Sequence, residues 1–220
     1  MKILVTGAAG FIGFHLINRL LQDNFFVYGI DNFSDNYHKN LKIYRLSLLK
    51  HKNFKFSEKN ILDLPESLDT KFDILVHLAA QPGVRLTSNL HHKYFDSNVF
   101  GFMKVCQFCK DNDINQMIYA SSSSVYSDIQ ESSFSEHGTK LAPKSIYGTT
   151  KLFNEHYADM FTKLNDIRAI GLRFFSVYGP LGRPDMAYYL FTKSILDNEK
   201  IVLNNHGYMA RDMTYIDDVV

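Results

Sequence analysis

MKILVTGAAGFIGFHLINRLL, residues 1–21, places glycines at positions 7, 10 and 13 between a strand-like run and a run of helical period. A side chain at Gly7 would obstruct a tight turn out of the strand, one at Gly10 would hold a pyrophosphate away from the backbone, and one at Gly13 would separate helix from strand. The amides at the helix start would then receive the phosphates. The stretch therefore predicts a dinucleotide-binding turn.

Asp31 follows the next apolar run, near the spacing of about 20 residues at which such a turn has its acidic partner. Its carboxylate can accept hydrogen bonds from both hydroxyls of an adenosine ribose and would repel a 2′-phosphate, so the sequence favours NAD over NADP. The other interpretation is that Asp31 only begins a turn with Asn32. Asp63 is interpreted as a helix cap before Leu64 and not as a ligand contact.

Short apolar runs alternate with longer segments of helical period, the pattern of a parallel sheet covered by helices. The predicted strands are Ile3–Thr6, Phe26–Ile30, Phe54–Phe56, Ile74–Leu78, Met117–Ala120 and Ala169–Arg173. The predicted helices are Ile12–Leu21, Leu41–Lys50, Asn89–Cys109 and Ser145–Leu164. We therefore expect an α/β fold with a Rossmann-like doubly wound parallel sheet, whose ligands bind at the carboxyl ends of the strands.

The character of the chain changes after Arg173, where the turn-rich YGPLGRPD precedes another predicted helix and a short predicted strand at Ile201–Leu203. We expect a NAD-binding Rossmann domain over residues 1–173 and the start of a substrate-binding region over residues 174–220. Because the chain stops inside an apolar run, this second region is expected to be truncated.

Composition argues against several classes of protein. The 24 basic and 23 acidic residues leave a formal charge of +1, so no overall field favours nucleic acid or an anionic membrane as partner. No run approaches the roughly 18 apolar residues of a membrane span, and no signal-peptide pattern opens the chain. The two cysteines, Cys106 and Cys109, lack nearby histidines and are interpreted as buried thiols and not metal ligands, which favours a cytoplasmic location.

Tyr147 and Lys151 stand four residues apart in YGTTK, a spacing that puts both side chains on one helix face. A lysine ammonium, a helix N-terminus and an oxidised nicotinamide all favour phenolate, so we expect the pKa of Tyr147 to fall from about 10 toward neutrality. Tyr147 could then accept a proton from a sugar hydroxyl. The alternative is an exposed helix pair of no consequence.

Four consecutive serines, residues 121–124, follow a predicted strand in SSSSVY. Each brings a hydroxyl that needs a partner, which makes ordinary packing a poor explanation. We interpret them as a polar floor for a hydroxyl-rich or anionic substrate, with a solvated serine-rich loop as the alternative.

Several motifs together resemble the extended short-chain dehydrogenase/reductase family and are most similar to its nucleotide-sugar 4-epimerases, particularly the UDP-glucuronate 4-epimerases. They are GxxGxxG, HLAAQPGVR, SSSSVY, YxxxK, RFFSVYGPLGRPDMA and RDMTYIDD. The resemblance covers all 220 residues. It implies tightly bound NAD, removal of the C4 hydroxyl proton by Tyr147, transient C4 oxidation, and return of the hydride to the other face of the 4-keto sugar.

The resemblance also assigns roles to single residues. Ser122, Tyr147 and Lys151 would form the catalytic set, with Lys151 binding the nicotinamide ribose and Ser122 sharing the C4 oxygen. The cofactor contacts, besides Tyr147 and Lys151, would be Gly7, Gly10, Phe11, Ile12, Gly13, Asp31, Asn32, Asn60, Ile61, Leu78, Ala79, Ala80 and Asn98. The substrate contacts, besides Ser122 and Tyr147, would be Arg85, Ser123, Ser124, Ser176, Arg183 and Arg211.

The expected substrate is UDP-glucuronate, whose C6 carboxylate would meet Arg183, while Arg211 would contact the UDP phosphates. Ser123 and Ser124 replace the acidic residues of related 4,6-dehydratases and decarboxylases, which argues against those reactions. The alternatives are a 4-epimerase for UDP-glucose or UDP-N-acetylglucosamine, and a truncated, non-catalytic NAD-binding module. Two departures from the family pattern are Asn60, which replaces an aspartate, and Ser127, which replaces a glycine.

The resemblance further implies a homodimer, in which the predicted helices Asn89–Cys109 and Ser145–Leu164 of two copies form a four-helix interface. It also implies a role in polysaccharide biosynthesis.

Overall fold

The computed structural model describes residues 1–84, 86–126, 134–137, 140–208 and 210–220. Its centre is a sheet of six parallel strands in the order β3-β2-β1-β4-β5-β6, which confirms the predicted doubly wound architecture. The strands are β1 Lys2–Thr6, β2 Phe26–Asp31, β3 Phe54–Glu58, β4 Ile74–His77, β5 Gln116–Ser122 and β6 Arg168–Phe174.

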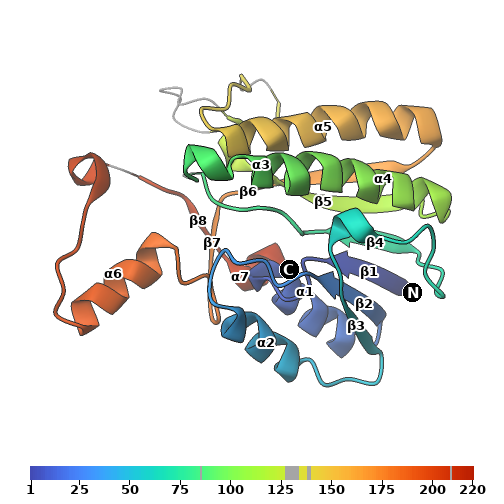
Figure 1. The fold of residues 1–220 in the computed structure, drawn as a ribbon, viewed down its shortest axis with the longest axis horizontal. Helices are drawn as coiled ribbons and strands as arrows, with labels where there is room; N and C mark the ends of the chain where they lie inside the picture. The colour runs from blue at the N-terminus through green and yellow to red at the C-terminus, as the bar shows by residue number, and fades with distance from the viewer. Residues whose placement is uncertain (85, 127–133, 138–139, 209) are drawn as a thin grey trace.

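Helices cover both faces of this sheet (Figure 1). One layer holds α1, Phe11–Gln22, and α2, Lys39–Leu48. The other holds α4, Gly101–Asp111, and α5, Ile146–Asn165, which run side by side. A short turn η1, Ile61–Asp63, follows β3. Parallel strands require such crossover helices because consecutive strands must run in the same direction.

Strands β1 and β4, at the centre of the sheet, bury both of their faces, as strands in a covered parallel sheet do. Leu4 and Leu75 belong to the core that contains Phe102 of α4. Val5 of the same strand β1 belongs to the opposite core, with Ile17 of α1. Successive side chains of a strand point to opposite faces, so each of these central strands contributes to two cores.

The segment predicted as one helix, Asn89–Cys109, is helical but not uniform. The turn η2, Ser88–Leu90, and the single-turn helix α3, His92–Tyr94, lead into η3, Phe95–Phe100, a stretch with π-helical hydrogen bonds that continues into α4. π-Helical turns often mark functional sites. Here the turn borders the site, because Ser97 lines the main cleft.

The predicted strand at Ile201–Leu203 is wrong. These side chains are exposed and lie in irregular backbone, because no neighbouring strand pairs with them. The strand in this part of the chain is β8, Met213–Tyr215, which pairs in parallel with β7, Ser176–Tyr178. An apolar run alone therefore did not locate the strand.

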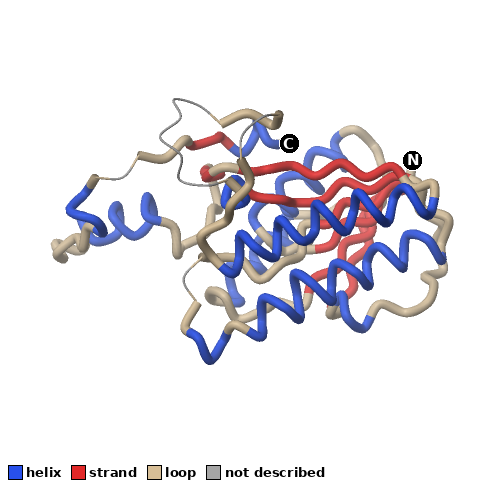
Figure 2. Tube along the Cα trace, turned by 90° about the horizontal axis from the view of Figure 1, so that it is seen from above, coloured by secondary structure: helices blue, strands red, loops and turns tan. Residues whose placement is uncertain are grey.

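The remaining elements after β6 are α6, Ala187–Leu196, η5, Asn204–Gly207, and α7, Ile216–Val219. Helix α6 buries none of its residues and projects away from the sheet (Figure 2). By contrast, Ile216 of α7 is fully buried against Phe11 of α1. The division into domains at residue 173 stays a prediction. None of the helices in the described part of the chain is long and apolar enough to cross a bilayer.

Candidate functional site

The glycine turn joins β1 to α1 at the carboxyl end of the sheet. Gly7 has a φ of +75°, and a Cβ there would lie 2.7 Å from the amide nitrogen of Ala79. A Cβ on Gly13 would collide with the carbonyl oxygen of Gly7. Both positions therefore require glycine, because the turn packs tightly against the end of β4 and the start of α1.

Asp31 fixes this turn from the end of β2. Its carboxylate is buried and accepts hydrogen bonds from the amides of Ala9, at 3.0 Å, and Phe33, at 2.8 Å. The contact with Phe33 is the local turn that was the alternative interpretation. The contact with Ala9 adds a second role, since it holds the carboxylate beside the glycine turn.

A single cleft runs across the carboxyl ends of the strands and gathers most of the predicted site. Its lining includes the predicted cofactor and substrate residues Gly7, Gly10, Phe11, Ile12, Gly13, Asp31, Asn32, Ile61, Leu78, Ala79, Ala80, Ser122, Ser123, Ser124, Tyr147, Lys151, Ser176 and Arg183.

Three predicted residues do not line this cleft. Asn60 caps η1 by accepting a hydrogen bond from the amide of Leu62, which is the role that sequence analysis gave to Asp63. Asn98 is buried and holds the backbone of Gln81 through two hydrogen bonds of 2.8 and 3.1 Å. Arg211 is exposed. Arg85 and Ser127 lie outside the described residues.

The start of α5 presents Tyr147 and Lys151 to the cleft. Ser145 caps the helix by accepting a hydrogen bond from the amide of Gly148 at 3.0 Å. Lys151 is buried, and its Nζ donates to the carbonyl of Ala120 at 2.8 Å and lies 5.9 Å from the ring centroid of Tyr147. The YxxxK spacing therefore places both side chains on the cleft side of one helix, as predicted.

The protein groups around Tyr147 shift its pKa against the predicted direction, while the predicted effect of an oxidised nicotinamide stays a prediction. Burial raises the pKa of Tyr147, and it outweighs the hydrogen bond from Ser122 and the positive charge of Arg183, which both lower it. Burial also lowers the pKa of Lys151 to about 8, which weakens its hold on a proton. The groups that favour the phenolate here are thus Ser122 and Arg183, and sequence spacing alone indicated only Lys151.

The serine run turns away from the strand at the end of β5. Ser122 Oγ accepts a hydrogen bond from the amide of Ser124 at 3.1 Å and caps a short turn, η4, Ser123–Val125. Ser121 instead donates to Glu155 of α5 at 2.5 Å. All four serines, residues 121–124, line the cleft, as the polar-floor interpretation requires.

Arg183 reaches the same cleft from the turn after β7. Its guanidinium binds Asp185 through Nε at 3.0 Å and Nη2 at 2.5 Å. Its positive charge also acts on Tyr147 and on Tyr37. A cation beside Ser122 and Tyr147 suits a substrate that carries both a reacting hydroxyl and an acidic group.

One cleft contains the glycine turn, its acidic partner, the buried lysine and the tyrosine. Comparison with known proteins shows which family carries this combination. The family model described as NAD dependent epimerase/dehydratase family matches residues 3–220. The chain belongs to this family. The family assignment confirms NAD as the cofactor that the glycine turn and Asp31 predicted.

Three similar proteins show how much of their sequence and structure this chain shares. Protein CapI of Staphylococcus aureus is 43% identical over all of this chain and 67% of its own length. UDP-glucuronate 4-epimerase 4 of Arabidopsis thaliana is 43% identical, but the chain covers 52% of it. The crystal structure of UDP-glucuronic acid 4-epimerase from Bacillus cereus, in complex with UDP-glucuronic acid and NAD, is 38% identical with a TM-score of 0.92, over all of this chain and 70% of that one.

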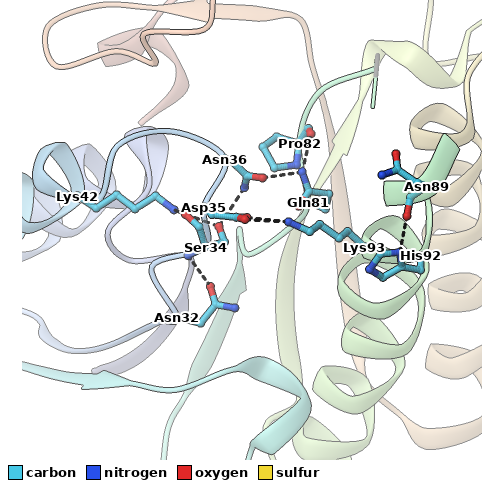
Figure 3. Close-up of polar contacts among 10 residues, drawn as sticks. All are labelled: Asn32, Ser34, Asp35, Asn36, Lys42, Gln81, Pro82, Asn89, His92 and Lys93. Atoms are coloured by element: carbon cyan, nitrogen blue, oxygen red, sulfur yellow. Dashed lines mark hydrogen bonds and ion pairs between the residues drawn. The ribbon is translucent and has the colours of Figure 1, made fainter. Parts of the chain in front are cut away.

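A pair of polar contacts that sequence analysis missed joins the segment after β2 to the chain that follows β4 in this epimerase-family protein, and one of the two lies between the cleft-lining residues Asn36 and Gln81 (Figure 3). Gln81 Nε2 donates to Asn36 Oδ1 at 2.6 Å, and Lys93 Nζ lies 2.9 and 3.0 Å from the two carboxylate oxygens of Asp35. We call these two contacts the polar clasp. No local signal could have revealed it, because the partners are 45 and 58 residues apart in sequence.

Removal of the clasp should speed NAD release. Asn36→Ala deletes the more protected of the two contacts, and a hydrogen bond of this kind contributes about 1 kcal/mol, so the dissociation rate of NAD should rise about fivefold. Stopped-flow displacement of bound NAD measures this rate. Asn40→Ala, an exposed position on α2, is the matched control and should leave it unchanged. Equal rates in both variants would contradict a role of the clasp in retention.

His77 at the end of β4 gives the fold of this family member a pH dependence. Its Nδ1 lies 2.7 Å from the hydroxyl of Thr6, and burial together with the charge of Lys151 lowers the pKa of His77 to about 3. Unfolding returns that pKa to about 6.5, so the unfolded chain binds the extra proton first and stability falls as pH drops from about 6.5 toward 3.

His77→Asn should flatten this dependence, because asparagine does not titrate. Urea denaturation at pH 7.5 and at pH 5 should show a smaller loss of unfolding free energy in His77→Asn than in the unmodified chain. His92→Asn, at an exposed histidine of α3, should keep the original loss. A variant at His77 with an unchanged pH dependence would assign the effect to other groups.

Proposed function

We propose that this chain carries the cofactor-binding and catalytic part of a UDP-sugar 4-epimerase that interconverts UDP-glucuronate and UDP-galacturonate. The observation that supports it best is the position of Arg183, whose charge acts on Tyr147 across a cleft lined by serine hydroxyls. A reacting hydroxyl and an acidic group on one sugar would fit these two side chains together. The relatives named for UDP-glucuronate agree with this assignment.

The residues present fit NAD. The glycine turn offers backbone amides at the start of α1, and Asp31 lies beside that turn with a carboxylate suited to ribose hydroxyls. Lys151 lines the same cleft near Tyr147. When bound, NAD supplies a reversible hydride acceptor, which suits a reaction that oxidises and then reduces the same carbon.

Tyr147 is the proposed base for the C4 hydroxyl. Ser122 is hydrogen-bonded to Tyr147 and would share the same sugar oxygen. Because burial raises the pKa of Tyr147, its phenolate needs the support of Ser122 and of the positive charge on Arg183. Tyr147 would take the C4 proton onto its phenolic oxygen when the sugar is oxidised and return it when the hydroxyl reforms.

Selectivity for an acidic sugar is proposed to rest on Arg183 with Ser123, Ser124 and Ser176, which all line the cleft. Arg183 already binds Asp185, so a substrate carboxylate would have to share or displace that partner. No acidic residue occupies positions 123 and 124, so the general acid of a dehydratase or decarboxylase has no counterpart there. Arg85 and Arg211 stay predicted contacts.

Two other functions remain as alternatives to be tested. A 4-epimerase for UDP-glucose or UDP-N-acetylglucosamine would use the same Tyr147, but its sugar would carry no carboxylate for Arg183 to bind. A non-catalytic NAD-binding module would need neither residue, and the shared position of Ser122, Tyr147 and Lys151 in one cleft argues against it.

A homodimer in the cytoplasm is part of the proposal, as is a role in polysaccharide biosynthesis. Exposed apolar side chains lie on η3 and on the second half of α5, where Phe100, Met160 and Leu164 are 56%, 57% and 76% exposed. Pairing of two copies through this layer would cover them and would form the four-helix interface that the resemblance implies.

Incubation with UDP-glucuronate and NAD, followed by chromatography for UDP-galacturonate, tests the proposal. Turnover by this chain, or by any longer product of the same gene, would support it. Turnover of UDP-glucose with none of UDP-glucuronate would favour the neutral-sugar alternative. NAD binding without turnover of either sugar, in both the short and the longer product, would favour the binding module.

A further inference from the structure

Arg45 of α2 is a cation buried in the protein that the sequence analysis did not single out. Its side chain belongs to a residue with 0% exposure. The hydrogen bonds that it makes all go to carbonyl and hydroxyl oxygens. A buried cation of this kind is costly unless its donors are satisfied, so the position of each acceptor is informative.

The acceptors of Arg45 come from three separate segments. Nε and Nη2 both donate to the carbonyl of Leu181, at 3.0 and 2.7 Å, and Nη2 lies 3.3 Å from the carbonyl of Gly182. Nη1 donates to the carbonyl of Ala9 at 3.0 Å and to the hydroxyl of Tyr37 at 2.5 Å. One guanidinium thus connects the glycine turn, the segment after β2 and the turn after β7.

The turn after β7 needs such support. Leu181 has a φ of +56°, a left-handed conformation that costs a residue with a side chain about 1–2 kcal/mol. The amide of Gly182 closes the turn on the carbonyl of Gly179 at 3.1 Å, and His15 of α1 contacts the carbonyl of Pro180 at 2.9 Å. In Figure 1 this orange turn reaches down beside α2, where Arg45 meets it.

Arg183 follows this turn directly in the chain. Its guanidinium lies on the cleft wall, where its charge acts on Tyr147. Any movement of the carbonyls at positions 181 and 182 therefore moves the backbone from which Arg183 reaches the cleft. The fork of Arg45 is suited to prevent that movement, because its planar geometry fixes several acceptors at once, whereas a lysine offers a point charge.

We propose that Arg45 is a positioning residue that holds the turn at residues 179–182 against the glycine turn and so aims Arg183 at the substrate beside Tyr147. The part that concerns substrate rests on the proposed function. The part that concerns the turn rests on the hydrogen bonds of Arg45 alone.

Arg45→Lys tests this role, with Arg19→Lys on the exposed face of α1 as the matched control. Hydrogen–deuterium exchange should be faster in the peptide that covers residues 179–186 of Arg45→Lys, and unchanged in peptides from β1 and β4. Calorimetric titration of the NAD-loaded protein with UDP-glucuronate should show a dissociation constant raised about tenfold, while the control keeps the original value.

A double-mutant cycle separates positioning from general loosening. If Arg45 acts through Arg183, Arg45→Lys should change the UDP-glucuronate dissociation constant less than about twofold when Arg183→Ala is already present. Full additivity of the two changes, or unchanged exchange in residues 179–186, would overturn the proposal. Absence of UDP-glucuronate binding in the unmodified protein would defeat the proposed substrate, and the exchange result would still decide whether Arg45 holds the turn.

Arg45→Gln is the second variant. Its side-chain amide is uncharged, so it is less costly to bury than a lysine, and it can still donate a hydrogen bond to the carbonyl of Leu181. It should fold and show intermediate exchange in residues 179–186. Circular dichroism and thermal melting report the fold of each variant. Unfolding of both Arg45→Lys and Arg45→Gln would overturn a positioning role, since Arg45 would then hold the whole fold and not one turn.

Discussion

Tyr147→Phe should lower kcat for epimerisation of UDP-glucuronate about a thousandfold, because a positioned acid–base group contributes about 10²–10⁴ to such a step. The substitution removes the oxygen that would take the C4 proton and keeps the ring. Its ring lies on the first turn of a capped helix, so the fold should be retained. Chromatography of the two UDP-sugars after incubation measures the loss.

Tyr157→Phe on the same helix is the control for this prediction, since its ring packs against the core away from the cleft lining. It should keep nearly full activity. NAD binding, measured by calorimetry, should be similar in Tyr147→Phe and Tyr157→Phe. Equal rates of epimerisation in the two variants would show that Tyr147 is not the base.

Arg183→Ala should discriminate between acidic and neutral sugars. We expect kcat/KM for UDP-glucuronate to fall roughly 100-fold, since the loss of one partner of a charge-assisted pair costs 2–5 kcal/mol or more in comparable interfaces. The freed Asp185 would then repel the substrate carboxylate. Activity on UDP-glucose, where it is measurable, should fall by a smaller factor, because that sugar has no carboxylate for Arg183 to bind and loses only the support that Arg183 gives the Tyr147 phenolate.

Asp185→Asn serves as the companion variant for Arg183→Ala. It removes the competing carboxylate and keeps the arginine, so affinity for UDP-glucuronate should stay the same or improve. Steady-state kinetics with both sugars measure the two effects. A loss of equal size on the acidic and the neutral sugar in Arg183→Ala would limit Arg183 to structure or to support of Tyr147 and would favour the neutral-sugar alternative.

Much of the site could be anticipated because its signals are local. The glycine spacing predicts the tight turn between β1 and α1, and the four-residue spacing of Tyr147 and Lys151 predicts that both side chains share one helix face. The polar floor followed from the improbability of four packed serines. Each of these features depends on residues within about one helical turn or one strand of each other, so the pattern is visible in a single sequence.

Other features needed the folded chain. Asn60, and not Asp63, caps the turn after β3, because capping depends on backbone angles at the helix start. The strand after α6 lies at Met213–Tyr215, because pairing with β7 decides it and local apolar content does not. The pKa of Tyr147 rises because burial of the phenol outweighs its favourable neighbours.

The alternating strands and helices, the glycine turn with Asp31, and the face shared by Tyr147 and Lys151 could be predicted from the chain alone, since each follows from the short-range geometry of the backbone. The partners of Arg45, the polar clasp and the charge environment of Tyr147 became visible in the folded molecule. Arg45 and Leu181 are 136 residues apart, and their hydrogen bond exists because the packing of α2 beside the turn after β7 brings a buried guanidinium to that carbonyl. Long-range contacts of this kind depend on the whole fold and leave no periodic trace in the chain.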